Sequence, residues 1–230
     1  MAGRGSRFST EGYDVPKPFI EVNGKPMVER VVQNINLKHC KFIFICQKSH
    51  LTESRKKVLE NLSNDVEIVA IDGYTRGTAE TVLIGTEDFD LSGPIYIVNS
   101  DQLVTWDHDS LVSKNPDGAV VCFNGSGENW SYVKLGNNDE VIEVAEKKKI
   151  SDIATAGVYY WRSGDSFRKY AKAMIDKDLR VNGEFYVAPV YQEAINDKKL
   201  ITIDFCHTLE QLGTPEELVK YLENNVFINT

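Results

Sequence analysis

The feature that most constrains the fold is a regular alternation, in the first hundred residues, of short apolar runs with longer polar stretches. The apolar runs cover residues 41–46, 66–71 and 94–99, and helical patterns cover residues 26–36 and 52–61. Compact runs such as KFIFIC are typical of parallel strands, which are buried on both faces. Alternating strands and helices imply βαβ crossovers, so we predict an α/β fold with a mainly parallel, doubly wound, Rossmann-like sheet in three layers.

The second half of the chain has a different pattern. Short strand-like segments at residues 119–123, 132–135 and 141–144 are separated by Gly, Asn and Asp turns. This spacing predicts antiparallel hairpins, and hence a small antiparallel sheet inserted into the main fold. Farther along, we predict strands at residues 155–161 and 200–205, and helices at residues 165–176, at residues 185–195 and after Thr214.

Composition excludes several classes of protein. The formal net charge of −8 argues against a nucleic-acid-binding or anionic-membrane surface. The sequence contains no apolar run of about 18 residues, so we expect no membrane insertion. The four cysteines and four histidines are scattered without metal-ligand spacing, which favours a cytoplasmic protein with reduced cysteines and no zinc site.

The opening stretch carries the strongest functional signal. Gly3, Gly5 and Ser6 are followed by Arg7 and, about ten residues later, by Lys17 between two prolines. Small residues allow the backbone to approach a ligand, and successive N–H groups form a concave anion site. Arginine and lysine add charge and directed donors for phosphate oxygens. We therefore predict a polyphosphate-binding loop, although a Walker A motif is absent.

Further motifs extend this signal along the chain. They are the glycine-punctuated Gly77-Thr78-Ala79, with Thr78 as the expected N-cap of a helix, the strand-end Asp101, Glu146-Lys147, and the closing segment 213–216. Together with the opening motifs, they make the chain resemble the sugar-phosphate nucleotidylyltransferases, also called NDP-sugar pyrophosphorylases. The resemblance covers most of the chain. It implies a GT-A-type variant of the Rossmann-like fold and a single domain over residues 1–230, with a nucleotide-binding half (1–118) and an acceptor-binding half (119–230).

The resemblance also implies a reaction. A nucleoside triphosphate and a small phosphorylated sugar or polyol would give an NDP-linked product and pyrophosphate, with Mg²⁺ as cofactor. Such chemistry requires positioning and charge neutralisation more than a protein nucleophile, and the sequence shows no nucleophilic triad. The implied product would serve capsule or surface polysaccharide synthesis. The sequence leaves the oligomeric state open, with a homo-oligomer as one alternative.

The resemblance assigns roles on the nucleotide side. Arg7 would neutralise the leaving pyrophosphate, Lys17 would hold the α-phosphate and the acceptor phosphate, and Asp101 would bind Mg²⁺. The other nucleotide-binding residues would be Ala2, Gly3, Arg4, Gly5, Ser6, Gly77, Thr78, Ala79, Glu80 and Ser100. A carboxylate accepts hydrogen bonds but cannot donate, so Glu80 slightly favours cytosine or guanine, unless it faces solvent.

The acceptor side would be formed by Glu146, Lys147, Gly157 and Glu184. Lys147 would grip the acceptor phosphate and Glu146 would contact acceptor hydroxyls. Two other interpretations stay open, because EKKK could be a solvated charge run and Glu184 could cap a helix.

The chain departs from the family pattern at several points. The family usually has an apolar strand immediately before Ala2 and Gly3, whereas this sequence begins at Met1, so we expect the usual first strand of the sheet to be missing. Two explanations stay open, because Met1 could be an internal methionine of a longer chain or the protein could be a natural truncation. The usual second metal-binding aspartate is also absent, and Glu210 is one candidate for its role. Two other functions therefore remain open. One is a GT-A-like glycosyltransferase using Asp107 and Asp109 as a DxD pair, and the other is a truncated, non-catalytic nucleotide-binding protein.

Overall fold

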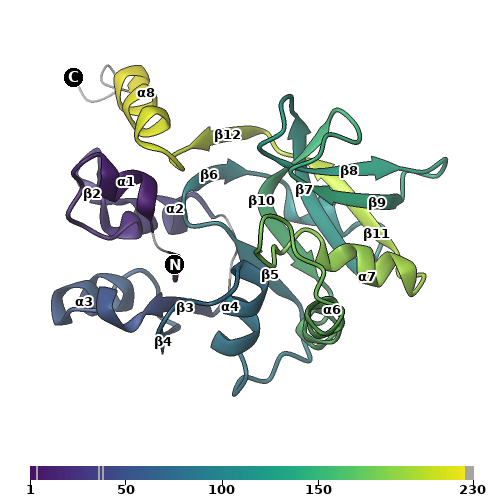
Figure 1. The fold of residues 1–230 in the computed structure, drawn as a ribbon, viewed down its shortest axis with the longest axis horizontal. Helices are drawn as coiled ribbons and strands as arrows, with labels where there is room; N and C mark the ends of the chain where they lie inside the picture. The colour runs from purple at the N-terminus through teal and green to yellow at the C-terminus, as the bar shows by residue number, and fades with distance from the viewer. Residues whose placement is uncertain (4, 36, 38, 226–230) are drawn as a thin grey trace. The chain divides into compact units, whose positions relative to one another are not determined.

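The computed structural model describes residues 1–3, 5–35, 37 and 39–225 (Figure 1). The chain divides into two compact units, which are described separately. Unit 1 contains Met1–Tyr74, Asn99–Thr105 and Thr208–Thr230. Unit 2 contains Thr75–Val98 and Trp106–His207.

Unit 1 contains the first parallel pair of strands. The strands β3 (Phe42–Gln47) and β4 (Val66–Ile71) run parallel and are joined through the helix α3 (Glu53–Glu60), as the sequence predicts. Thr52 caps α3 by accepting a hydrogen bond from the Arg55 backbone N–H at 3.3 Å. The other early elements are α1 (Ser6–Thr10), η1 (Lys17–Phe19), β1 (Glu21–Val22), β2 (Lys25–Pro26), α2 (Met27–Asn34) and η2 (Lys48–His50).

The apolar core of unit 1 lies between α2, α3 and the strand β3. Its buried members are Val28, Val32, Phe44, Cys46 and Leu59. The alternation of apolar and polar residues in α2 places its valines on one face, so that face packs against the strand.

Unit 1 also contains a strand pair that the sequence does not predict. The strand β6 (Gln102–Thr105) runs antiparallel to β12 (Thr208–Gln211), and the helix α8 (Pro215–Asn225) follows. Thr214 Oγ1 accepts from the Glu217 N–H at 3.2 Å, and Glu217 Oε2 accepts from the Thr214 N–H at 2.9 Å. This reciprocal capping box fixes the start of α8.

Unit 2 is built around a six-stranded sheet with β10 (Ile153–Trp161) at its centre. The strand β10 pairs antiparallel with β5 (Ile95–Val98), β7 (Gly118–Asn124) and β8 (Ser131–Leu135). The strands β8 and β9 (Val141–Glu146) form a predicted antiparallel hairpin, and β11 (Ile201–Phe205) pairs parallel with β7. The predicted α/β fold, with parallel pairs and an inserted antiparallel sheet, is confirmed; in the sheet of unit 2 as described, β7 and β11 form the parallel pair and the other pairings are antiparallel.

Helices cover the sheet of unit 2. They are α4 (Thr78–Gly85), α5 (His108–Val112), α6 (Gly164–Asp176) and α7 (Val190–Asn196). Residues of α4, α6 and α7 join the core of this unit. In that core the rings of Trp161 and Tyr191 stack with centroids 4.3 Å apart, which adds roughly 0.5–1.5 kcal/mol beyond burial. The prediction that α7 begins at residue 185 is wrong, because Pro189 is its N-cap.

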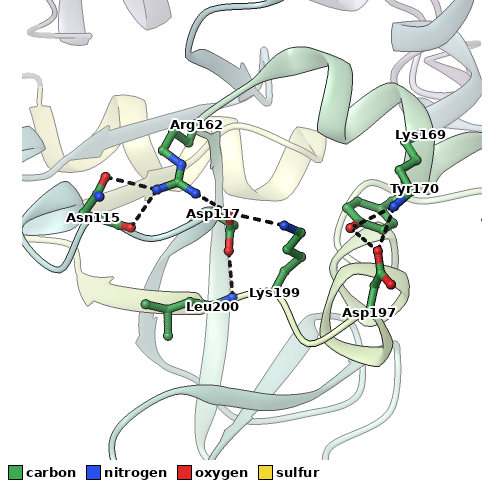
Figure 2. Close-up of polar contacts among 8 residues, drawn as sticks. All are labelled: Asn115, Asp117, Arg162, Lys169, Tyr170, Asp197, Lys199 and Leu200. Carbon is green, nitrogen blue, oxygen red and sulfur yellow. Dashed lines mark hydrogen bonds and ion pairs between the residues drawn. The ribbon is translucent and has the colours of Figure 1, made fainter.

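A set of polar contacts connects the ends of three adjacent strands of this sheet (Figure 2). Asp117 pairs with Arg162, and its Oδ2 accepts from the Leu200 N–H at 3.0 Å. The Arg162 guanidinium also donates to the backbone and side-chain oxygens of Asn115, both at 3.2 Å. These contacts join the start of β7 to the end of β10 and the start of β11.

Candidate functional site

The first cluster of predicted site residues lies in unit 1 around the ammonium group of Lys17. Lys17 Nζ donates to Oδ2 of Asp101 at 2.6 Å and to the carbonyl oxygen of Gly213 at 2.7 Å. The same nitrogen lies 5.3 Å from the ring centroid of Phe8, which is buried. The structure therefore brings together the opening loop, the strand-end aspartate and the closing glycine motif.

The strands β6 and β12 explain how these distant segments meet. Their antiparallel pairing continues into a hydrogen bond from the Leu212 N–H to the carbonyl of Asp101, 2.9 Å long. A Cβ on Gly213 would lie 3.6 Å from Asp101 Oδ2 and 3.8 Å from Lys17 Nζ. Residue 213 thus lies with its backbone directly beside both charged groups. Its carbonyl could not be identified from the sequence, because a backbone group carries no residue-specific signal.

The opening loop approaches Lys17 through a glycine in the left-handed region. Gly5 has φ +61° and is the N-cap of α1, and a Cβ there would lie 3.5 Å from the Lys17 Cβ. Gly3 has open space around it. The carbonyl of buried Ala2 accepts a hydrogen bond from the Gln47 side chain at 2.9 Å, which fixes the start of the loop on β3.

The remaining nucleotide-side residues of unit 1 have less defined contacts. Arg7 lies exposed on α1, and Ser6 is the first residue of that helix. Hydrogen bonds with its own backbone N–H and with Thr214 lower the pKa of Glu216, and the charge of Arg7 contributes. Ser100 lies in the turn that precedes β6. Arg4 lies outside the described residues.

The oxygens around Lys17 fit a magnesium ion. Asp101 Oδ2 and the Gly213 carbonyl already face one cation, and both are hard oxygen donors of the kind Mg²⁺ prefers. Within the described part of the chain, no group of three or more His, Cys, Asp or Glu residues could hold a metal ion. Mg²⁺ commonly binds one or two carboxylates and takes its other ligands from water and substrate phosphates, so this donor set is sufficient.

The second predicted segment, around Gly77, lies in unit 2. Gly77 has φ +138° and is the N-cap of α4, so the prediction that Thr78 is the N-cap is wrong. Glycine is required because a Cβ at residue 77 would lie 2.4 Å from both the backbone N and O of Phe185. The Phe185 carbonyl accepts from the Ala79 N–H at 2.9 Å, which replaces a capping side chain.

Glu80, in the first turn of α4, has its carboxylate engaged by Arg76. The carboxylate accepts from the Arg76 backbone N–H at 2.5 Å and from Nε and Nη2 of the same residue at 2.8 Å and 2.5 Å. Although burial opposes it, these hydrogen bonds hold the pKa of Glu80 below its ordinary value. The Glu80 carboxylate is therefore ionised and fixed in position by Arg76, and it can accept hydrogen bonds; only 13% of the side chain is exposed.

The predicted acceptor residues Glu146 and Lys147 follow β9 in unit 2. Glu146 is 9% exposed and accepts a hydrogen bond from Ser131. Burial raises the pKa of Glu146, and the Ser131 hydrogen bond and the charge of Lys147 oppose that shift. Lys147 has φ +52°, and its Nζ donates to Tyr186 Oη at 2.5 Å. The interpretation of this segment as a solvated charge run therefore does not hold for its first two residues.

Glu184 and Gly157 occupy other parts of unit 2. Glu184 forms a two-way backbone bridge with Val181 and is close enough to Glu146 to contribute to its raised pKa. Gly157, with φ +72°, lies where the register of β10 against β7 shifts between Thr155 and Tyr159. Sequence reasoning did not single out Tyr186 or Ser131. Tyr186 could have been found from its place two residues after Glu184, since alternate residues of an extended segment share a face.

Comparisons with known proteins show which family and fold the chain is similar to. A model of the nucleotidyl transferase family matches residues 1–219. A solved nucleoside-diphosphate-sugar pyrophosphorylase from Vibrio cholerae RC9 aligns with a TM-score of 0.86 and 28% identity, covering 97% of this chain and 98% of that chain. The inositol-1-phosphate CTP transferase from T. maritima aligns with a TM-score of 0.73 and 14% identity, covering 97% and 94% of the two chains, and supports the fold alone.

A curated relative matches over a similar length. The bifunctional protein GlmU of Methanococcus maripaludis is 24% identical over 99% of this chain and 53% of its own length. The chain thus spans about half the length of the first curated relatives it matches. Within the described residues, no helix is both long and apolar enough to span a membrane.

Proposed function

The chain belongs to the nucleotidyl transferase family, and on that premise we propose that it transfers a nucleotidyl group from a nucleoside triphosphate to the phosphate of a small sugar or polyol. Pyrophosphate is the second product. The observation that carries the proposal is the convergence of Lys17, Asp101 and the Gly213 carbonyl. The name of the Vibrio cholerae structure supports a nucleotide-sugar product.

In the proposed reaction, an oxygen of the acceptor phosphate attacks the α-phosphorus in line. A new P–O bond forms while the bond to the β-phosphate oxygen breaks, and that oxygen leaves with pyrophosphate. Lys17 holds the α-phosphate and the acceptor phosphate, and Arg7 neutralises charge on the leaving group. The backbone N–H groups of the loop around Gly5 bind the triphosphate. No protein nucleophile is needed, because positioning and charge neutralisation supply the catalysis.

Asp101 and the Gly213 carbonyl are the groups that would hold Mg²⁺. The ion would neutralise phosphate charge and orient the triphosphate oxygens. Lys17 pairs with Asp101 in this structure. Binding of the triphosphate therefore requires the Lys17 ammonium to exchange a carboxylate oxygen for phosphate oxygens.

The acceptor group would bind in unit 2. Lys147 would bind the acceptor phosphate, while Glu146 and Glu184 would accept hydrogen bonds from sugar or polyol hydroxyls. Gly157 would let the acceptor approach the backbone at the irregularity of β10. Burial favours the protonated form of Glu146, which can also donate one hydrogen bond.

The nucleotide base would lie against the segment that contains Gly77, Thr78, Ala79 and Glu80. The ionised, held carboxylate of Glu80 favours a base edge with N–H donors, which supports cytosine or guanine. We further propose that residues 1–230 act as one nucleotidyltransferase domain of a cytoplasmic homo-oligomer, and that its product supplies surface polysaccharide synthesis.

One observation disfavours the glycosyltransferase alternative. Asp107 Oδ1 accepts from the backbone N–H groups of Asp109 and Ser110 at 2.9 Å and 3.1 Å. Asp107 is therefore the N-cap of α5, so its carboxylate already has a structural role and the DxD pair is not arranged as two free metal ligands.

The test is a pyrophosphate-release assay with four nucleoside triphosphates against sugar 1-phosphates and polyol phosphates, with and without Mg²⁺. We expect turnover with one triphosphate, and a loss of about 10²–10³-fold in Arg7→Ala and Asp101→Ala. Asp14→Ala, which alters an exposed carboxylate that has no assigned role, is the control and should retain wild-type turnover. Tight triphosphate binding without turnover across the whole panel would instead identify a non-catalytic protein.

A further inference from the structure

We propose that Tyr186 is a positioning residue that holds the Lys147 ammonium for the acceptor phosphate. The inference rests on the proposed function, because it concerns the same acceptor site. It adds a residue that neither the sequence motifs nor the comparisons assign.

The evidence is a pair of contacts between the two side chains. Lys147 Nζ donates to Tyr186 Oη at 2.5 Å and lies 4.5 Å from the centroid of the Tyr186 ring. The ammonium is thus held both by a hydroxyl and by the negative face of an aromatic ring. Lys147 is also in the left-handed region, with φ +52°, a conformation that non-glycine residues seldom adopt. Its backbone N–H donates to the Trp130 carbonyl at 2.9 Å, which fixes that conformation.

The backbone around Tyr186 is held firmly enough to serve this purpose. The preceding residue, Phe185, is fully buried. Its N–H donates to the Arg76 carbonyl at 2.8 Å, and its carbonyl accepts from the Ala79 N–H at 2.9 Å. The following residue, Val187, is 4% exposed. Tyr186 therefore extends from a segment whose position is fixed on both sides.

The chemical type of the partner supports a phosphate-binding role. A phenol and an aromatic face hold an ammonium without cancelling its charge, whereas a carboxylate would neutralise it. Glu184 lies near enough to contribute to the raised pKa of Glu146, yet among the described residues no carboxylate forms an ion pair with Lys147. An ammonium has three donors, so two remain for phosphate oxygens after one binds Tyr186.

The first test follows Lys147 directly and does not depend on turnover. The protein is prepared with ¹³C-labelled lysine, which leaves all three N–H donors of each ammonium in place, and the Lys147 side-chain signal is assigned by its loss in Lys147→Arg. We expect the wild-type signal to be displaced by the ring current of Tyr186 and to move on titration with inorganic phosphate. Tyr186→Leu should abolish the displacement and weaken phosphate binding by about tenfold, the effect of one charged hydrogen bond. An unchanged Lys147 signal in Tyr186→Leu overturns the proposal.

The second test uses Tyr186→Phe, which retains the ring and should fold normally in thermal denaturation. We expect the acceptor KM to rise about tenfold while the nucleotide KM and kcat change less than about twofold. Tyr221→Phe, a substitution in α8, is the matched control and should change neither KM. Equal effects on both KM values, or none on either, would show that Tyr186 has no such role. If the wild type releases no pyrophosphate, the proposed function fails, while phosphate titration of Tyr186→Phe still decides the role of Tyr186.

Discussion

Gly77→Ala is the substitution whose effect follows most directly from the structure. Gly77 has φ +138°, a region that side chains other than glycine rarely adopt. A Cβ at this position would lie 2.4 Å from the N and O atoms of Phe185 and 2.8 Å from its carbonyl carbon. Ordinary contacts begin near 3.4 Å, so the new methyl group would overlap backbone atoms that no side-chain rotation can move.

Two contributions set the magnitude. Alanine in this conformation costs roughly 1–3 kcal/mol of strain. Relief of the overlap requires Phe185 to move, which breaks its hydrogen bonds with Arg76 and Ala79, at roughly 0.5–1.5 kcal/mol each. The expected loss in the free energy of unfolding is therefore about 2–6 kcal/mol, a large share of the 5–15 kcal/mol typical of a folded domain.

Urea unfolding measures this loss, and the chain offers two matched controls. Gly73 has φ +74° with no heavy atom within 4 Å of the position that a Cβ would take, so Gly73→Ala isolates the strain and should cost about 1 kcal/mol. Gly93 has neither a positive φ nor a near contact, so Gly93→Ala should change stability by less than about 0.5 kcal/mol. A Gly77→Ala protein no less stable than Gly73→Ala would refute the reasoning, because the Phe185 backbone would then be free to yield.

Two further predictions concern charged groups. Lys17→Met removes the ammonium that competes with a metal ion for the oxygens of Asp101 and Gly213. Binding of Mn²⁺, used in place of Mg²⁺ and measured by electron paramagnetic resonance without nucleotide, should therefore tighten several-fold, while turnover is lost. Lys48→Met, at an exposed lysine, is the control and should leave Mn²⁺ binding unchanged. Equal Mn²⁺ affinity in the wild type and both variants would contradict the proposal that Lys17 and the metal ion compete for the same oxygens. Because burial raises the folded-state pKa of Glu146 above 4.5, its contribution to stability is present below that pH and is lost as pH rises through the raised pKa. Glu146→Gln should therefore become more stable relative to wild type as pH rises in urea unfolding, and a constant difference would show that Glu146 titrates normally.

The features that the sequence predicts well are those encoded locally. The helices predicted at residues 52–61 and after Thr214 are both present, and the side chains that cap them, Thr52 and the Thr214–Glu217 pair, lie within a few residues of each helix start. The pairing of β6 with β12 joins segments about a hundred residues apart and could not be predicted from short-range patterns. The start of α7 was mispredicted for a similar reason, since Phe185 is held in the preceding segment by Arg76 and Ala79.

The same distinction applies to the candidate site. Motifs identified Lys17, Asp101 and Lys147 individually, because charged residues at fixed positions are visible in a sequence. The partners of these residues were not visible, since one is a backbone carbonyl and another is Tyr186, an aromatic residue of the kind more often found in a core. The sequence thus predicts the charged residues of the candidate site, whereas the partners that position their side chains are seen only in the tertiary structure.

The two lysines are held by partners of opposite kinds, and under the proposed function this difference has a consequence. Lys17 is paired with a carboxylate, so its charge is available to phosphate only after another cation neutralises Asp101. Mg²⁺ held by Asp101 and the Gly213 carbonyl would supply that cation, so metal binding and phosphate binding would be coupled. Lys147 is held by the phenol of Tyr186 and not by a carboxylate, so binding of the acceptor phosphate requires no such exchange. Nucleotide binding should therefore depend on Mg²⁺ more steeply than acceptor binding, and equal dependence would mean that the Lys17–Asp101 pair persists during the reaction.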